Sequence, residues 1–458
     1  MIHVGMDFGT SNSSIALYDH EGGGIRLFPV DPDNINPNLL RSFIYMTRDY
    51  EHYTGSEAVR QYLEHETGRP VYWETKPVGT IQNVWSGVPS TGGEPIFVER
   101  DVVAEVDVAA HGRLIQSIKT ALRRPGPLIR GRSDSPRIQV FERLYPVEDL
   151  IALLMGRMRE SAEQALGQPV DGVVIGRPVR ISEDPVIDAR GEDILRDAAR
   201  FAGFKEIAFE LEPVAAAHAY HRIAADRQTA LVFDFGGGTL DLTVVEVGGQ
   251  AAPKVLASHG ILLGGDDLDR ALIRLLRPHL GEGATLRDGT PLPAHILEQL
   301  NSWQAMVELS RPRYREVMRQ AMLGSDPEAI SRLEALVRHN LGFKLFQELE
   351  QGKIRLSSTD RIDIALSLNG AELRERITRT QFERLIQDEL AQVDESLDEV
   401  LRLAGLEAGG IDVVVRTGGS AEVPAFIRLL ERKFGEDRLR PLNPFETIVG
   451  GLAFQAAG

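Results

Sequence analysis

The sequence has no cysteine among its 458 residues, which excludes disulfides, a thiolate nucleophile and a zinc–thiolate site. It also has no apolar run approaching the about 20 residues that a membrane-spanning helix needs. The first residues lack the basic and apolar regions of a signal peptide. We therefore expect a cytoplasmic location and no membrane partner.

Basic residues are outnumbered by acidic ones, 51 against 67, which gives a net charge of −16. Such an excess of negative charge repels nucleic-acid phosphates, so we expect no nucleic-acid partner. Only seven of the basic residues are lysine, so a lysine at a motif position carries more information than an arginine. With 43% hydrophobic and 26% charged residues, the composition is that of a soluble globular protein of two or three domains.

Two segments far apart in the chain carry the same pattern. In each, an apolar strand ends in aspartate and leads through a glycine-rich turn into a second strand; the turns are DFGTS at 7–11 and DFGGGT at 234–239. We expect β-hairpins with strands at 2–8 and 14–18 and at 230–235 and 240–247. Glycine lets the backbone approach an anion and direct N–H groups at it. The repeat predicts two similar lobes facing each other across one nucleotide.

The aspartates that begin these turns, Asp7 and Asp234, are candidate magnesium-facing residues. A single Asp-Phe-Gly triplet is weak evidence, because aspartate often starts a turn by bonding its own backbone. Two copies in the same context favour the functional interpretation. Since Mg²⁺ keeps several waters and contacts one or two carboxylates plus phosphate oxygens, both aspartates can act through water.

Two further motifs lie downstream of the first hairpin. Glu212 precedes Pro213 and a run of alanines, a pattern that marks a helix start with a carboxylate at its mouth. Alone it would more often be a helix cap; between two lobes it can orient or deprotonate an attacking water. The segment 417–420 (TGGS) follows an apolar strand and offers a flat backbone surface to a nucleoside. A Gly-Gly turn by itself is more often structural.

The rest of the pattern alternates between helices and strands, which predicts mixed sheets covered by helices. We expect a Pro- and Gly-rich insertion at about 29–112, with short strands at 42–47 and 96–98, and a basic loop at 123–137. Helices are expected at 146–166, 193–202, 293–309, 314–322, 327–349, 380–403, 424–434 and 444–457, and strands at 172–175, 361–368 and 411–416.

Taken in order, these motifs resemble the actin-like ATPase domain of the heat shock protein 70 (DnaK-type) chaperones. The resemblance covers nearly the whole chain, and the segment 174–179 (VIGRPV) is most similar to the short YegD-like members. It implies an α/β fold of two lobes in which a ribonuclease H-like motif is duplicated, each lobe with a mixed sheet, flanking helices and an inserted subdomain. Lobe I would span 1–223 with its insertion at about 40–112, and lobe II 224–443 with a helical insertion at about 264–350. A terminal helix at 444–458 would return to lobe I.

The resemblance also implies ATP or ADP with Mg²⁺ between the lobes. By motif position, the metal residues are Asp7 and Asp234, and the catalytic residues are Glu212, Asp234, Asp7, Thr239 and Arg60. The implied nucleotide contacts are Gly9, Thr10, Ser11, Asn12, Gly236, Gly237, Gly238, Thr239, Gly264, Gly265, Asp266, Asp267, Glu350, Lys353, Ser358, Gly418, Gly419 and Ser420.

Three departures from the family pattern modify these expectations. The family's catalytic lysine follows a Gly-Asp-Ala-Ala-like segment, whereas here 55–58 (GSEA) leads to Val59 and Arg60. Arg60 is the candidate replacement, and because a guanidinium is not a point-charge ammonium, slow hydrolysis is expected. Ile354 and Glu422 stand where the chaperones carry arginines that sandwich adenine. The chain ends at Gly458, before the segment that grips peptides in those chaperones, so a client or partner would use another surface, for which the enlarged region 282–340 is the candidate.

The leading hypothesis is a Mg-ATP-binding, slowly hydrolysing chaperone-like protein. The alternatives are a nucleotide-switched scaffold that does not hydrolyse ATP, motivated by the missing lysine, and a small-molecule kinase on the same fold.

Overall fold

The computed structural model describes residues 1–20, 24–85, 96–126, 128–129, 132–133, 135–368, 370, 372–443 and 446–457. Parts of the expected basic loop at 123–137 and the two ends of the expected terminal helix, at 444–445 and 458, lie outside the described residues.

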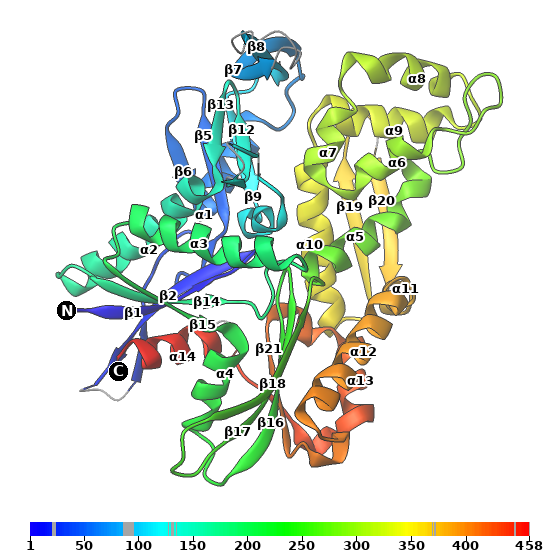
Figure 1. The fold of residues 1–458 in the computed structure, drawn as a ribbon. Helices are drawn as coiled ribbons and strands as arrows, with labels where there is room; N and C mark the ends of the chain where they lie inside the picture. The colour runs from blue at the N-terminus through cyan, green and yellow to red at the C-terminus, as the bar shows by residue number, and fades with distance from the viewer. Residues whose placement is uncertain are drawn as a thin grey trace, which may run out of the picture.

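Two lobes, each built on a mixed sheet, form the molecule (Figure 1). The lobe I sheet has the order β15 (Glu206–Leu211), β14 (Gly172–Arg177), β1 (His3–Phe8), β2 (Asn12–Asp19) and β3 (Gly24–Leu27), and β4 (Leu40–Arg41) also pairs with β2. The lobe II sheet has the order β18 (Lys254–Ile261), β17 (Leu240–Val247), β16 (Gln228–Phe235), β21 (Val413–Thr417) and β22 (Leu439–Pro441).

The two sheets have the same topology. In each, a hairpin and a third strand run antiparallel, and two later strands add in parallel on the other side of the first strand. Both predicted hairpins are confirmed, with the aspartates at the ends of β1 and β16. The duplication expected from the repeated turns is therefore a duplication of strand order as well.

Helices cover both sheets. In lobe I, α2 (Val147–Leu166) and α3 (Pro185–Phe201) bury one side of the sheet. The prediction for α3 started eight residues too late, because Asp184 accepts hydrogen bonds from the N–H groups of Val186 and Ile187 and so caps an earlier start. In lobe II, α5 (Gly265–Leu276), α12 (Gln387–Ala404) and α13 (Pro424–Phe434) pack on the sheet, and α11 (Arg379–Leu385) precedes α12.

Two helices fill the space between the sheets. The alanine-rich α4 (Glu212–His221) packs against β16, β17 and β21, and α14 (Thr447–Ala456) packs against α4, β1, β2 and β14. The approach is backbone to backbone: a Cβ on Gly5 would lie 2.2 Å from the Ala453 nitrogen, and one on Gly451 would lie 1.9 Å from the Ala215 oxygen. In Figure 1, α14, in red, lies beside the blue and green strands of lobe I.

The lobe I insertion has more regular β structure than the sequence predicted. It contains a sheet of β6 (His52–Thr54), β5 (Phe43–Thr47) and β9 (Gly112–Gln116), with helix α1 (Gly55–His65) packed on it. It also contains a long hairpin of β7 (Trp73–Trp85) and β8 (Ile96–Asp107). The 3₁₀ helix η1 (Ile118–Arg123) and two hairpins follow, β10 (Leu128–Ile129) with β11 (Arg132–Ser133) and β12 (Arg137–Val140) with β13 (Arg143–Pro146).

The lobe II insertion is mostly helical. It comprises α6 (Ala294–Glu298), α7 (Trp303–Glu308), α8 (Pro312–Met322), α9 (Pro327–Arg338) and α10 (Gly342–Ser358), followed by the hairpin of β19 (Arg361–Ser367) and β20 (Glu372–Thr378). The single helix expected at 327–349 is broken, because Asn340 takes the left-handed conformation, with φ of 49°. Its side-chain amide donates to the Tyr62 hydroxyl and the Glu66 carbonyl, so the break occurs where the two insertions touch.

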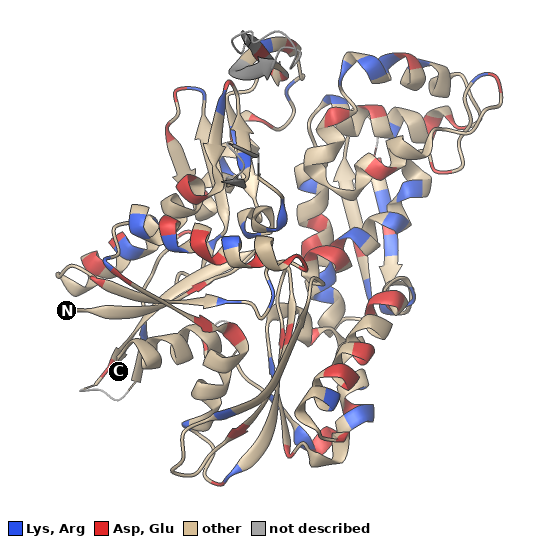
Figure 2. Ribbon diagram, in the orientation of Figure 1, with Lys and Arg blue, Asp and Glu red and all other residues tan. Residues whose placement is uncertain are grey.

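Acidic and basic residues are interspersed along the ribbon of both lobes (Figure 2). No helix in the described part of the chain combines the length and the hydrophobicity of a membrane span.

Docking of α14 can be tested with two neighbouring glycines. Gly451→Ala places a methyl group 1.9 Å from a backbone oxygen that cannot move freely, so we expect a loss of about 1–3 kcal/mol of stability. Gly450→Ala is the matched control, because its nearest neighbour, Ile25 Cγ1, is 3.4 Å away and alanine favours a helix by up to about 1 kcal/mol. The measurement is the thermal midpoint of each variant; equal midpoints would contradict this packing.

Candidate functional site

A narrow cavity of about 220 Å³ lies between the two hairpin turns. Both turns contribute to its wall, with Asp7 and the segment 9–12 from lobe I and Asp234 and the segment 236–239 from lobe II. The lobes meet closely here: a Cβ on Gly237 would lie 2.5 Å from Ser11 Oγ, and one on Gly238 would lie 2.8 Å from Thr10 Oγ1. A side chain at either position would displace the Ser11 or Thr10 hydroxyl.

Carboxylates form the floor of the cavity. Burial raises the pKa of Asp7 to about 7, and the negative charge of Glu212 adds to the rise. Burial and the charge of Glu212 likewise hold the pKa of Asp234 well above its usual range. Behind them, Asp241 has a pKa raised by burial to about 7 and accepts a hydrogen bond of 2.6 Å from the Val179 N–H. The ionised forms of these carboxylates repel one another. A nearby positive charge would stabilise the ionised forms.

Lys119 supplies positive charge at this floor. Its Nζ lies 2.7 Å from Glu212 Oε1, with side-chain exposures of 10% and 9%, and it opposes the rise in the pKa of Asp7 and Asp234. The sequence-based site did not include Lys119. The rarity of lysine was the available signal, together with the position of Lys119 beside the apolar residues Ile115, Ile118 and Leu122.

The structure places Arg60 elsewhere, and its assignment as the catalytic cation is corrected here. Helix α1 turns Ala58, Val59 and Tyr62 toward the protein interior, which leaves Arg60 on the outer face with 61% of its side chain exposed. There it pairs with Glu57 and, at 3.4 Å, with Asp33. Arg60 does not line the cavity.

The lobe II side of the cavity is organised around Lys353. Its Nζ lies 2.8 Å from Asp269 Oδ2 and donates to the Gly265 carbonyl at 2.9 Å. Burial raises the pKa of Asp266 to about 6, and the Ser117 hydroxyl of lobe I lies 3.3 Å from its carboxylate. Asp269 and Asp266 both line the cavity, and the sequence analysis did not single out Asp269.

The turn after β21 closes the same side. Gly418 has φ of 83°, and a Cβ there would lie 2.3 Å from the Phe235 oxygen, so only glycine fits. Ser420 Oγ donates to the Gly236 carbonyl at 2.9 Å, which ties this turn to the second hairpin turn. Gly418, Gly419 and Ser420 all line the cavity.

Most of the predicted nucleotide contacts come together, and three do not line the cavity. Ser358 is exposed and donates to the Arg355 carbonyl. Asp267 accepts a hydrogen bond from the Gly264 N–H as the cap of α5. Gly264 itself supports the turn from behind, since a Cβ there would lie 2.3 Å from the Gly237 oxygen.

Ile354 and Glu422, the two residues that depart from the family's adenine-contacting arginines, lie in different surroundings. Ile354 lines the cavity with 55% of its surface exposed, and Glu422 lies 3.2 Å from Arg416, within lobe II.

Asp7 and Asp234 fit a Mg²⁺ ion whose remaining ligands come from water and from a bound phosphate group. Among the described residues, no group of three acidic or histidine side chains has metal-binding geometry. Mg²⁺ needs only one or two carboxylates when waters and phosphate oxygens complete its shell. Asp7 and Asp234, whose buried carboxylates have raised pKa values, match that requirement.

The comparisons with known proteins agree with this geometry. The family model for the Hsp70 protein matches residues 119–289 and 335–457. The chain belongs to the Hsp70 family. Its fold is accordingly the two-lobed actin-like ATPase fold, as predicted. The family model does not match residues 1–118 or 290–334, and the second of these segments falls inside the helical insertion of this Hsp70 chain.

Among curated relatives, the chain is 27% identical to the chaperone protein DnaK of Thermus thermophilus, over 99% of this chain and 60% of that protein. It is 30% identical to chaperone protein DnaK 1 of Synechococcus, over 69% of this chain and 36% of that one. The identity to chaperone protein dnaK1 of Nostoc is 26%, over 99% and 54%. This Hsp70 chain thus spans 60% or less of the length of these relatives.

The buried pair of Lys353 and Asp269 should be important for the stability of lobe II. Both side chains are less than 15% exposed, so Lys353→Ala leaves an unpaired buried carboxylate and is expected to cost about 3–5 kcal/mol. Lys205 makes a pair of nearly the same length with Asp171 but is 74% exposed, so Lys205→Ala should cost no more than about 1 kcal/mol. Chemical denaturation measures both, and similar losses would show that burial does not set the strength of the pair.

Proposed function

We propose that this protein is a Mg-ATP-binding, slowly hydrolysing chaperone-like member of the Hsp70 family. The observation that carries the proposal is that the two repeated turns line one cavity, with Asp7, Glu212 and Asp234 at its floor. Hsp70 proteins as a family bind ATP or ADP with Mg²⁺, and the relatives that match over the whole chain are chaperones by name. We also propose the lobe boundaries given above and a cytoplasmic location.

The polyphosphate chain would lie between the two glycine turns. Their backbone N–H groups and the hydroxyls of Thr10, Ser11 and Thr239 supply donors to its oxygens from both lobes. Asp7 and Asp234 would hold Mg²⁺, which neutralises phosphate charge when bound. Lys353, Glu350 and the segment 418–420 would receive the nucleoside, and Gly264 and Asp267 would shape the turn that contacts the phosphates.

Hydrolysis would depend on Glu212 and Lys119. Glu212 stands at the mouth of α4, where its carboxylate can orient and deprotonate an attacking water. The ammonium of Lys119, 2.7 Å away, holds that carboxylate in place and adds the positive charge that the transferred phosphoryl group needs. We therefore assign to Lys119 the role first assigned to Arg60. With a lysine available, the alternative of a scaffold that binds ATP without hydrolysing it is less favoured.

Opening of the lobes would accompany nucleotide exchange. The cavity of about 220 Å³ is smaller than the about 300–1,000 Å³ typical of small-molecule sites. The two lobes are therefore in a closed position. Entry of a whole nucleotide therefore requires the lobes to separate. We propose that this motion controls the binding of a partner or client, and that the helical region 282–340 is the contacting surface.

Nucleotide binding should be visible as stabilisation. A ligand that binds only the folded state at 100 times its Kd adds about 2.7 kcal/mol to the free energy of unfolding. We therefore expect millimolar Mg-ATP to raise the thermal midpoint, and Gly237→Val, which places a branched side chain between the two turns and displaces the Ser11 hydroxyl, to abolish the rise. Unchanged midpoints for the wild-type chain at millimolar Mg-ATP would refute the proposal.

The catalytic assignment calls for single-turnover measurements on three variants. Glu212→Gln and Lys119→Met should each slow hydrolysis at least about 100-fold, as expected for loss of a general base or a charge-stabilising group, while ATP still binds. Arg60→Gln is the matched charge-removing control on the surface and should hydrolyse ATP at the wild-type rate.

If Arg60→Gln stops hydrolysis and Lys119→Met does not, the assignment of Lys119 is wrong. If the wild-type chain binds ATP but shows no turnover, the scaffold alternative holds.

A further inference from the structure

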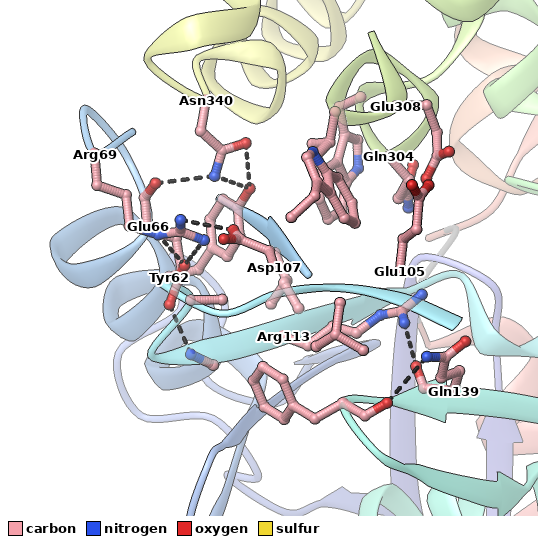
Figure 3. A pocket seen from close by; sticks show the side chains of 18 of the residues that line it. Tyr62, Glu66, Arg69, Glu105, Asp107, Arg113, Gln139, Gln304, Glu308 and Asn340 are labelled. Carbon is pink, nitrogen blue, oxygen red and sulfur yellow. Dashed lines mark hydrogen bonds and ion pairs between the residues drawn. The ribbon is translucent and has the colours of Figure 1, made fainter. Parts of the chain in front are cut away.

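A second cavity, of about 290 Å³, lies between the insertions of the two lobes and shares no lining residue with the nucleotide cavity. Lobe I contributes α1, β8 and β9 to its walls together with the segment 139–141, and lobe II contributes α7, Arg311 and Asn340. Figure 3 shows these side chains converging from both lobes.

The walls of this cavity are held by satisfied polar contacts. Glu66, whose side chain has no exposure, accepts hydrogen bonds from the Tyr45 hydroxyl at 2.9 Å and the Gly112 N–H at 2.7 Å. The indole N–H of Trp303 donates to Gln116 at 2.6 Å, and that of Trp73 donates to Ser310 at 2.8 Å. These bonds cross between the lobes or brace the lining residues, so the cavity is a built feature rather than a loose gap.

Two of the three arginines in the wall already have counter-ions. Arg69 lies 2.5 Å from Glu66 and 2.7 Å from Asp107. Arg311 lies 2.5 Å from Glu308, pairs with Glu105, and stacks on the Trp73 ring at 4.3 Å. Neither guanidinium therefore has its charge free for a ligand.

Arg113 differs from both. Its guanidinium donates to the Gln139 carbonyl, and no carboxylate among the described residues forms an ion pair with it. The Arg113 side chain is exposed and lines the cavity. Burial lowers the pKa of Arg113, with the charge of Glu308 only partly opposing the change. Figure 3 shows Arg113 bonded to the segment that carries Gln139, below the residues of lobe II.

The remaining lining is suited to a flat apolar group. Trp73, Trp303 and Phe141 present aromatic surface, and Gln304 and Gln139 add amide groups. Small-molecule sites typically combine such apolar walls with a few placed polar groups. A guanidinium with free N–H groups matches the two oxygens of a carboxylate or the oxygens of a phosphate.

We propose that this cavity binds a small organic anion, a carboxylate or phosphate with a flat apolar body, through the Arg113 guanidinium and the aromatic walls. The volume limits the ligand to about one or two rings. The residues that would bind this anion are separate from those that line the nucleotide cavity.

Tryptophan fluorescence tests the proposal directly, since two of the three tryptophans of the chain line the cavity. The full chain is titrated with benzoate and with phenyl phosphate, and with neutral benzamide as the uncharged match. Mg-ADP is present throughout, so that phenyl phosphate does not report on the glycine turns. We expect saturable quenching at millimolar or lower concentration by at least one anion, and benzamide should bind at least about tenfold more weakly. The anion that binds more tightly identifies the carboxylate or the phosphate class.

Variants assign the binding to Arg113. Arg113→Gln should weaken anion binding about tenfold or more, and Arg113→Lys should retain part of it because the charge remains without the fork. Arg376→Gln is the control, since Arg376 is 66% exposed and pairs with Asp363 on β20, outside the cavity. Thermal midpoints show that the variants fold. The proposal is overturned if neither anion quenches, if benzamide binds equally well, or if Arg113→Gln leaves the affinity unchanged while folded.

Discussion

The crowding of negative charge at the base of the inter-lobe cleft is the constraint on which the rest of the structure depends. Asp7, Glu212 and Asp234 come from three different elements and lie in a place where burial makes each charge costly. A single ammonium group, that of Lys119, cannot balance them all. The floor is therefore suited to additional cations and to groups that carry them, and the packing of the strands, the start of α4 and η1 holds these side chains there.

Local patterns predicted the parts of the site that depend on local chemistry. The two turns and the start of α4 were recognisable because glycine, proline and aspartate have strong backbone preferences there. Lys119 was not, because it reaches Glu212 only after β9 and η1 fold against the lobe I sheet. Asn340 breaks a periodic helix to meet Tyr62 from the other lobe, a cause that no window of sequence contains. Ser358 matched its motif yet lies on the surface, since matching a motif does not fix a side chain's direction.

Contacts between the two insertions explain why the lobes are close together. Tyr62 and Phe43 of lobe I form edge-to-face contacts with Trp303 and Phe343 of lobe II, at centroid distances of 5.1–5.8 Å. Each such pair adds about 0.5–1.5 kcal/mol beyond the burial of its area. The same aromatic cluster borders the second cavity, so the lobe opening proposed for nucleotide exchange would also separate the walls of that cavity.

The position of α14 has a consequence for biogenesis. This helix follows the whole of lobe II in the chain, yet its glycines and alanines complete the packing of β1 and β2, which come first. During translation, the apolar face of these strands therefore stays exposed until lobe II and α14 have been synthesised. Exposed surface of that kind invites aggregation in a growing chain. Lobe I of this protein is thus finished only after lobe II has emerged.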